Sequence, residues 1–176
     1  MKLYKLTNNK SETYNNTKWA VGVKHRIFKR GHELCSDQVF HVYRHPVQAV
    51  FFNPIHANID NPRLFEVRTG KIVADDGTKV GVKTIEVIRE MVLPKLSREQ
   101  HITITIKCAK LVVDDKVWNL WADNWLSGKD RSEAAARAAA WEARVAAGAA
   151  AEAAAWAARA ADKDEILKII VKEVEQ

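Results

Sequence analysis

Basic and aromatic side chains gather in the first half of the chain, in a pattern that can bind a phosphorylated ligand. Up to Pro94 there are 15 Lys and Arg against 9 Asp and Glu, whereas from Lys95 onward there are 13 of each. Cationic donors form charge-assisted hydrogen bonds with phosphate, and aromatic rings stack on bases. The candidate contacts for such a ligand are Lys18, Trp19, Lys24, His25, Arg26, His41, Tyr43 and Arg63.

The densest basic cluster spans residues 24–32 and includes a turn residue, Gly31. A cluster of this kind can cradle a phosphate or a carboxylate. The net charge of +6 lies wholly in the N-terminal part, which favours an anionic partner there. The alternative is that the cluster is a solvated loop and that the charge excess only aids solubility.

Residues with the spacing of a catalytic or metal site are few. The chain lacks the GxxxxGK[ST], GxGxxG, HExxH and GxSxG patterns. Cys35, His41 and His45 can be grouped around zinc, but a fourth ligand is missing. Cys35 can also pair with His41 or His56 as nucleophile and base, although a buried, inert cysteine is the commoner case. We therefore predict no metal, no cofactor and no catalytic residue.

Short alternating runs before Pro94 predict a small, mostly antiparallel sheet. A hairpin-type turn is expected at Asp76-Gly77. His45-Pro46 precedes apolar residues at helical spacing, which predicts a short helix that stops at Asn53-Pro54. Residues 1–94 are thus predicted to form one basic α+β domain. Its strands are expected over residues 3–6, 19–23, 39–43, 64–67, 72–74 and 84–93.

Residues 95–176 are predicted to form a helical region. Ser97 and Gln100 have the spacing of a capping box, but the β-branched run that follows also suits a strand. Helix and strand therefore both stay open for residues 101–113. A compact helix with three tryptophans comes next, and core packing of these rings is favoured over a ligand platform. An amphipathic pattern from Ile166 to Val174 predicts the last helix.

An alanine-rich stretch near residues 131–161 predicts one long helix, because alanine has the highest helix propensity. Alanine alone occupies one side of its helical wheel, where Ala136, Ala143, Ala150 and Ala157 recur every seven residues. Methyl side chains let another helix approach closely. The partner can be residues 97–114, the last helix or the same stripe of another subunit. We predict the last of these, a homo-oligomer.

Several motifs resemble those of a family of uncharacterised proteins encoded by tailed phages. In the first domain they are TKWAVGVKHRI at residues 17–27, LCSD at 34–37, FH at 40–41, FNPIHA at 52–57 and PRLFE at 62–66. The segment WADNWLSGKDRS at 121–132, which leads into the alanine-rich tail, resembles the same group. The resemblance covers most of the chain and implies no particular activity.

A fainter similarity concerns small ADP-ribosyltransferase-like folds. It lies in the LYK strand at residues 3–5, the FH strand and the helix that follows. The first strand has neither the His nor the Arg with which such enzymes hold the nicotinamide dinucleotide, so the resemblance implies nucleotide binding rather than catalysis. Phage proteins of this size that bind without reacting include sponges for nucleotide immune signals.

We therefore predict a non-enzymatic, phage-type accessory protein that sequesters an anionic, nucleotide-type small molecule. One alternative is an ADP-ribosyl-type enzyme in which Glu66 or Glu86 stabilises an oxocarbenium-like state. A structural or ice-binding-like role of the alanine helix and nucleic-acid binding by the basic sheet are the others.

Cys35 and Cys108 are far apart in sequence, and neither a signal peptide nor a membrane span is recognisable. This predicts a location in the cytoplasm of an infected bacterial host.

Overall fold

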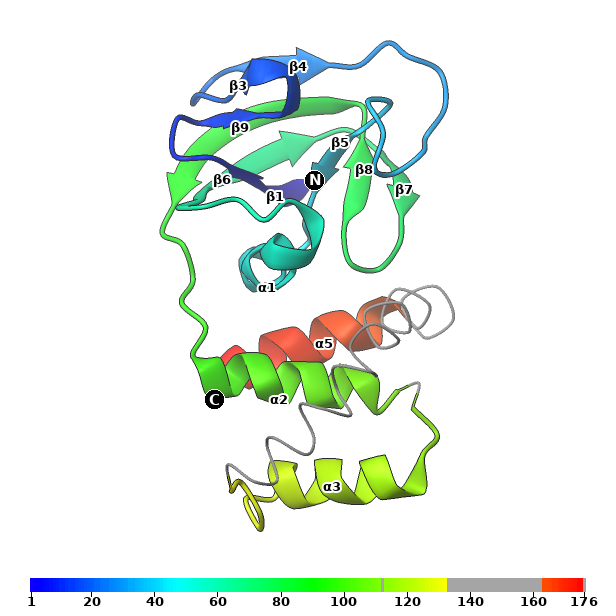
Figure 1. Cartoon of the computed structure of the whole chain (residues 1–176). Helices are drawn as coiled ribbons and strands as arrows, with labels where there is room; N and C mark the ends of the chain where they lie inside the picture. Colours follow the sequence, from blue (N-terminus) through cyan, green and yellow to red (C-terminus); the bar gives the residue numbers. More distant parts are fainter. Residues whose placement is uncertain (112, 133–162, 176) are drawn as a thin grey trace. The chain divides into compact units, whose positions relative to one another are not determined.

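The computed structural model describes residues 1–111, 113–132 and 163–175 of the chain (Figure 1). Contacts divide the chain into two compact units, Met1–Leu96 and Ser97–Gln176, close to the predicted boundary after Pro94. The first unit contains antiparallel sheets and one α-helix, and the described part of the second is helical. The predicted α+β class is therefore confirmed. The predicted alanine helix and its stripe of Ala136, Ala143, Ala150 and Ala157 lie outside the described residues.

The first unit, in which every residue is described, contains three antiparallel sheets. The largest has the strand order β1-β6-β9-β4 and consists of β1 (Lys2–Thr7), β6 (Arg63–Thr69), β9 (Thr84–Met91) and β4 (Lys24–Arg26). The second has the order β5-β8-β7 and consists of β5 (Phe40–Val42), β8 (Val80–Val82) and β7 (Ile72–Asp75). The third is a hairpin of β2 (Glu12–Thr13) and β3 (Thr17–Lys18), joined by the 3-10 turn η1 (Tyr14–Asn16).

Residues of both larger sheets share one apolar core. The four-stranded sheet contributes Leu3, Val67 and Ile85, and the second sheet contributes Val42 and Val80, all of them at most 2% exposed. Reciprocal backbone hydrogen bonds of 2.9 and 2.8 Å between Tyr4 and Tyr43 connect β1 to the end of β5. Because side chains alternate along a strand, the neighbours of the core residues lie on the opposite, outer face of the four-stranded sheet.

The strand predicted over residues 19–23 is wrong. Trp19 fits the inward position, but its backbone N–H donates to Ser11 O, and the chain then turns with Gly22 at a φ of 84°. The N–H of Val23 closes this turn by donating to Ala20 O at 2.9 Å. Gly22 N–H donates to Val87 O of β9 at 2.8 Å, and Val23 O accepts from Val87 N–H at 3.0 Å. The edge strand itself begins only at Lys24, so it consists of basic residues rather than of the apolar run.

Helix α1 (Pro46–His56) begins as predicted but runs through the expected stop at Pro54. At its start, His45 Nδ1 accepts a hydrogen bond from the N–H of Val47. Near its end, the Asn53 side chain donates to Ile59 O at 3.0 Å and accepts from Ile59 N–H at 3.1 Å. The prediction failed because this contact fixes the chain beyond the helix, where Pro54 alone suggested a break.

The described part of the second unit consists of α2 (Arg98–Ala109), α3 (Lys116–Leu126) and α5 (Lys163–Val174). The capping box at Ser97 is formed, so residues 98–109 are helical rather than a strand. Trp118 and Trp125 are buried against α2, and Lys107 Nζ lies 2.5 Å from a Glu173 carboxylate oxygen of α5. Among the described residues, no helix has the length and apolar character to cross a membrane.

In the first unit, one lysine fixes the basic loop between β4 and β5. Lys83 Nζ donates to the carbonyl oxygens of Lys29, Gly31 and Gln38, at 2.9, 2.6 and 2.6 Å. The Lys29 side chain also forms an ion pair with Asp37 across the loop. In the predicted phosphate cradle at residues 24–32, the carbonyl groups of Lys29 and Gly31 therefore bind the protein's own ammonium group.

We expect Lys83→Met to loosen this loop, because three carbonyl groups lose their charged donor. The free energy of unfolding should fall by about 1–3 kcal/mol. Urea unfolding measures this change, and limited trypsin digestion should cut faster after Lys29 and Arg30. The exposed Lys71 provides the control, since Lys71→Met removes one positive charge from the surface. Equal protease resistance of Lys83→Met and the native chain would contradict the role of Lys83.

Candidate functional site

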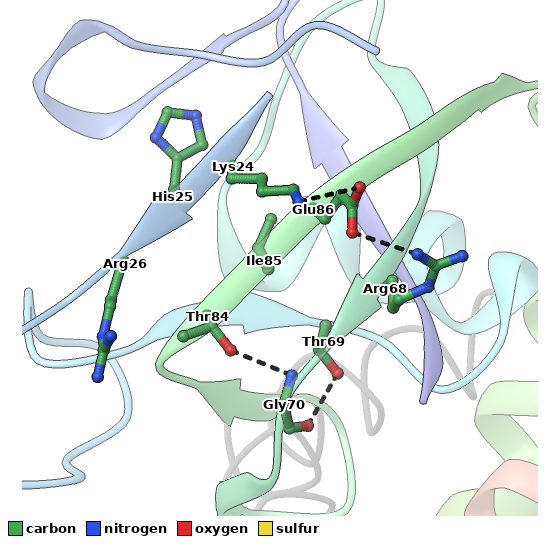
Figure 2. A pocket seen from close by; sticks show the side chains of 9 residues that line it. All are labelled: Lys24, His25, Arg26, Arg68, Thr69, Gly70, Thr84, Ile85 and Glu86. Carbon is green, nitrogen blue, oxygen red and sulfur yellow. Dashed lines mark hydrogen bonds and ion pairs between the residues drawn. The ribbon is translucent and has the colours of Figure 1, made fainter. Parts of the chain in front are cut away.

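The outer face of the four-stranded sheet carries an open pocket of about 370 Å³ (Figure 2). Antiparallel register builds it, because Glu86 on β9 lies opposite Lys24 on one side and Arg68 on the other. Arg26 lies opposite Thr84 in the same way. The residues that line the pocket are Lys24, His25, Arg26, Arg68, Thr69, Gly70, Thr84, Ile85 and Glu86.

Cations outnumber carboxylates in this pocket, which contains one acidic residue, Glu86. Lys24 Nζ is 3.6 Å and an Arg68 guanidinium nitrogen 3.3 Å from the Glu86 carboxylate oxygens. The two cationic side chains are 72% and 66% exposed, so these ion pairs contribute little to stability. Most of the donor groups of Lys24 and Arg68 therefore face solvent and can reach an anionic ligand.

An exposed aromatic ring lies beside the third cation of the pocket. The Arg26 guanidinium carbon is 4.8 Å from the centroid of the Phe28 ring, and Phe28 is 81% exposed. Within the described part of the chain, Arg26 forms no ion pair. A guanidinium with an adjoining free ring can bind a phosphate and stack on a base.

The structure places two of the residues predicted to bind a ligand, Lys24 and Arg26, in the lining of the pocket. His25 belongs to the pocket wall, but Figure 2 shows its ring pointing away from Arg26. The ring packs 4.6 Å from Trp19, and His25 Nε2 lies 2.8 Å from Lys18 O. Trp19 is 2% exposed, so it offers no ring face to a ligand in this structure.

Lys18 and Arg63, two other predicted ligand contacts, lie away from the pocket. Lys18 is an exposed residue of β3, whose partner strand is β2. Arg63 stands at the start of β6, where its Nε donates to Glu90 at 2.7 Å and its plane covers Phe65. Neither residue lines the pocket.

Tyr43 is part of a buried polar network at the end of β5, and not of the pocket. Its hydroxyl lies 3.1 Å from His56 Nδ1, and His56 Nε2 lies 3.2 Å from Thr78 Oγ1. The Thr78 hydroxyl donates to Asp76 at 2.7 Å, so it accepts from His56 and Nε2 carries the ring proton. His56 also stacks between the rings of Tyr43 and Phe52, at 5.9 and 5.2 Å.

Burial keeps the imidazoles of this region neutral. Burial, together with the charge of Lys79, lowers the pKa of His56 to about 4. Burial also lowers the pKa of His41 to about 4, with further contributions from Lys5 and Lys79. Burial raises the pKa of Tyr43 above its usual range. At neutral pH neither histidine supplies a positive charge to an anion.

Lys5 is a buried cation beside the same network. Its Nζ donates to His41 O at 3.0 Å and lies 5.2 Å from the Trp19 ring. Burial lowers the pKa of Lys5 to about 8. Lys5 therefore stabilises the contact between β1 and β5 from inside, where a ligand on the outer face does not reach it.

The residues considered for zinc are used separately in the structure. His45 caps α1, and His41 Nε2 accepts the backbone N–H of Cys35 at 2.9 Å. The described residues hold no group of His, Cys, Asp and Glu arranged for a metal ion. Cys35 Sγ lies 3.1 Å from Lys79 Nζ, so the lysine, and not His41 or His56, contacts the thiol.

Glu66 and Glu86, the carboxylates considered for ADP-ribosyl transfer, are both paired on the outer face of the sheet. Glu66 lies 2.8 Å from an Arg89 nitrogen and 3.3 Å from Lys2 Nζ. The hydrogen bond from Arg89 lowers the pKa of Glu66, and the hydrogen bond from Lys2 adds to this. Glu86 is held between Lys24 and Arg68. Each carboxylate thus balances two cations.

Sequence reasoning missed Arg68 and Phe28 as members of this site. Arg68 follows the core residue Val67, and that alternation is a signal that it faces outward. Its neighbours on β9 depend on the register, which the sequence does not specify. Phe28 looked like an ordinary apolar residue of a basic loop.

Comparisons of the chain with protein-family models, with characterised proteins and with solved structures found no match. Three cations, one paired carboxylate and an adjoining exposed ring are the features that any ligand has to satisfy.

The neutral histidines predict a pH dependence of stability. In the unfolded chain histidine titrates near 6.5 and so binds more protons than the folded chain between about pH 6.5 and 4. The free energy of unfolding should therefore fall as the pH drops through this window. We expect His56→Gln to weaken the fall between pH 7 and 5 in urea titrations. His32→Gln, which changes an exposed histidine, should leave it unchanged, and equal slopes for both variants would refute the assignment.

Proposed function

We propose that the protein binds an anionic, nucleotide-type small molecule in the outer-face pocket, and sequesters it without chemical conversion. The observation that carries this proposal is the presence of Lys24, Arg26 and Arg68 in one pocket, where Lys24 and Arg68 flank Glu86 and the exposed Phe28 ring lies beside Arg26. Phosphate is the anion that such donors suit best, because lysine and arginine both give charge-assisted hydrogen bonds to its oxygens.

The ring beside Arg26 favours a nucleotide over inorganic phosphate. A base that stacks on Phe28 would stand next to the Arg26 guanidinium, so that its phosphate can lie over β9 towards Arg68. Aromatic stacking contributes about 1–3 kcal/mol per base. Thr84 Oγ1, which accepts a hydrogen bond from the N–H of Gly70 at 3.2 Å, adds a hydroxyl at the floor of the pocket.

Binding without conversion is supported by what the pocket offers chemically. Its carboxylate, Glu86, is engaged by two cations, and the His25 ring points to the opposite side of β4. None of the lining residues is a thiol or an imidazole placed to accept a proton from the ligand.

A counter-defence role as a sponge for immune signalling nucleotides, in the cytoplasm of an infected bacterium, rests on the resemblance to tailed-phage proteins.

Removal of one pocket cation should weaken the binding of cyclic di-AMP or ATP, used as fluorescently labelled probes. Each charge-assisted hydrogen bond contributes about 1.5–3 kcal/mol, so Arg68→Gln and Arg26→Gln should each lower affinity about 10- to 150-fold. Lys10→Gln is the matched control, because it removes one exposed positive charge outside the pocket. Fluorescence anisotropy at fixed ionic strength measures the change, and equal losses in all three variants would contradict a defined site.

The fate of the probe separates sequestration from catalysis. After incubation with cyclic di-AMP, ATP or NAD, the protein is denatured and the released nucleotide is identified by mass spectrometry. We expect the bound nucleotide to be recovered intact. Recovery of a hydrolysed or transferred product would contradict sequestration and favour the enzyme. Competition by a single-stranded oligonucleotide with a steep salt dependence would instead favour nucleic acid as the ligand.

A further inference from the structure

A second reactive cluster lies outside the pocket, where the basic loop meets the turn before β8. Cys35 is an exposed residue of the loop, and Lys79 is the last residue of the turn. Lys79 Nζ lies 3.1 Å from Cys35 Sγ, and the lysine side chain is only 8% exposed. The contact thus joins a solvent-accessible thiol to a buried amine. Neither residue lines the pocket.

Backbone contacts hold both partners of this pair in place. On one side, the Asp76 carboxylate accepts hydrogen bonds from the N–H groups of Thr78 and Lys79, each at 2.9 Å, and lies 4.0 Å from Lys79 Nζ. On the other side, Cys35 has a φ of 62°, in the left-handed region that non-glycine residues seldom adopt. Its N–H donates to His41 Nε2 at 2.9 Å. The thiol and the amine are therefore aimed at each other by two independent segments.

The chain contains one other cysteine that could form a disulfide with oxidised Cys35. The other cysteine, Cys108, belongs to the helical unit and is 6% exposed. An oxidised cysteine condenses with a neighbouring thiol or nitrogen when one is in reach. At Cys35 the neighbour in reach is Lys79 Nζ.

We propose that Cys35 and Lys79 form a redox-controlled covalent cross-link in which one oxygen atom bridges Sγ and Nζ. The oxidant is a peroxide. An oxygen bridge suits the separation of 3.1 Å, because it joins the two atoms with little movement of either segment. A direct sulfur–nitrogen bond would require a much closer approach of two segments that are both held by hydrogen bonds.

The chemistry consumes two molecules of hydrogen peroxide. In the first step the thiol is oxidised to sulfenic acid, and the peroxide is reduced to water. In the second step the Lys79 ammonium group loses a proton to solvent, its nitrogen is oxidised, and an N–O bond forms to the sulfenic oxygen. The second peroxide accepts these two electrons, and two further waters leave. The product is Cys–S–O–NH–Lys, and a dithiol reductant returns the thiol and the amine.

Peptide mapping of the full chain after treatment with hydrogen peroxide tests this proposal. We expect a mass gain of one oxygen less two hydrogens, a single peptide that contains both Cys35 and Lys79, and loss of trypsin cleavage after Lys79. Dithiothreitol should restore the original mass and the cleavage. Cys108→Ser should retain the cross-link, whereas Cys35→Ser should abolish it.

Lys79→Arg keeps a positive charge in the turn but cannot form the cross-link, and thermal unfolding verifies that this variant folds. We expect it to accumulate sulfenic and sulfinic acid at Cys35. If the native chain instead gains whole oxygen atoms at Cys35 with a free Lys79, or forms a disulfide between two chains, the proposal is overturned. The native chain alone provides this outcome, so the test does not depend on the folding of a variant.

Discussion

Alternation of side chains along β4, β9 and β6 is the constraint on which the candidate site depends. β9 and β6 carry apolar residues such as Ile85 and Val67 towards the core, and their sequence neighbours Glu86 and Arg68 must then face outward. A slip of one residue in the pairing of β9 would bury these charges and expose the core. Burial of the apolar residues therefore determines which charged residues face outward, and no further interaction is needed to orient the cations.

The opposite side of the sheet accommodates polar groups in a different way. Lys5 and Tyr43 are buried, His41 and His56 are half-buried, and each has a hydrogen-bond partner from another segment. Such a network fixes the relative positions of β1, β5 and the turn before β8, because an unpaired buried polar group would be costly. It also brings Cys35 and Lys79 together. The outer face is thus suited to reversible binding. The inner network holds the strands in position, and the proposed covalent chemistry takes place at its edge.

The sequence was informative where one local pattern decides the structure. Alternation predicted β1, β6, β7 and β9 nearly in place, and the capping box at Ser97 predicted the start of α2. It was less informative where distant contacts decide. Trp19 alternates like a strand residue, yet its backbone pairs with Ser11; and β8 is a strand of three residues that depends on neighbours on both sides.

In the candidate site too, the sequence predicted what depends on local patterns and missed what depends on distant contacts. Lys24 and Arg26 were predictable from the clustering of basic residues, whereas their grouping with Arg68 required the register of three strands. Trp19, His41 and Tyr43 were assigned to a ligand from residue type alone, but their burial depends on how the two larger sheets share a core. Lys79 carried no signal, because only the folded turn directs its amine to a thiol 44 residues away.

The most direct test of the central claim is a titration of the isotope-labelled full chain with cyclic di-AMP, followed by nuclear magnetic resonance. A ligand in the outer-face pocket should shift the amide signals of Lys24 to Arg26, Gly70 and Thr84 to Glu86, as well as the ring signals of Phe28. The signals of the buried network around His56 should stay in place. Shifts confined to that network, or to the helical unit, would contradict the assignment of the pocket as the binding site.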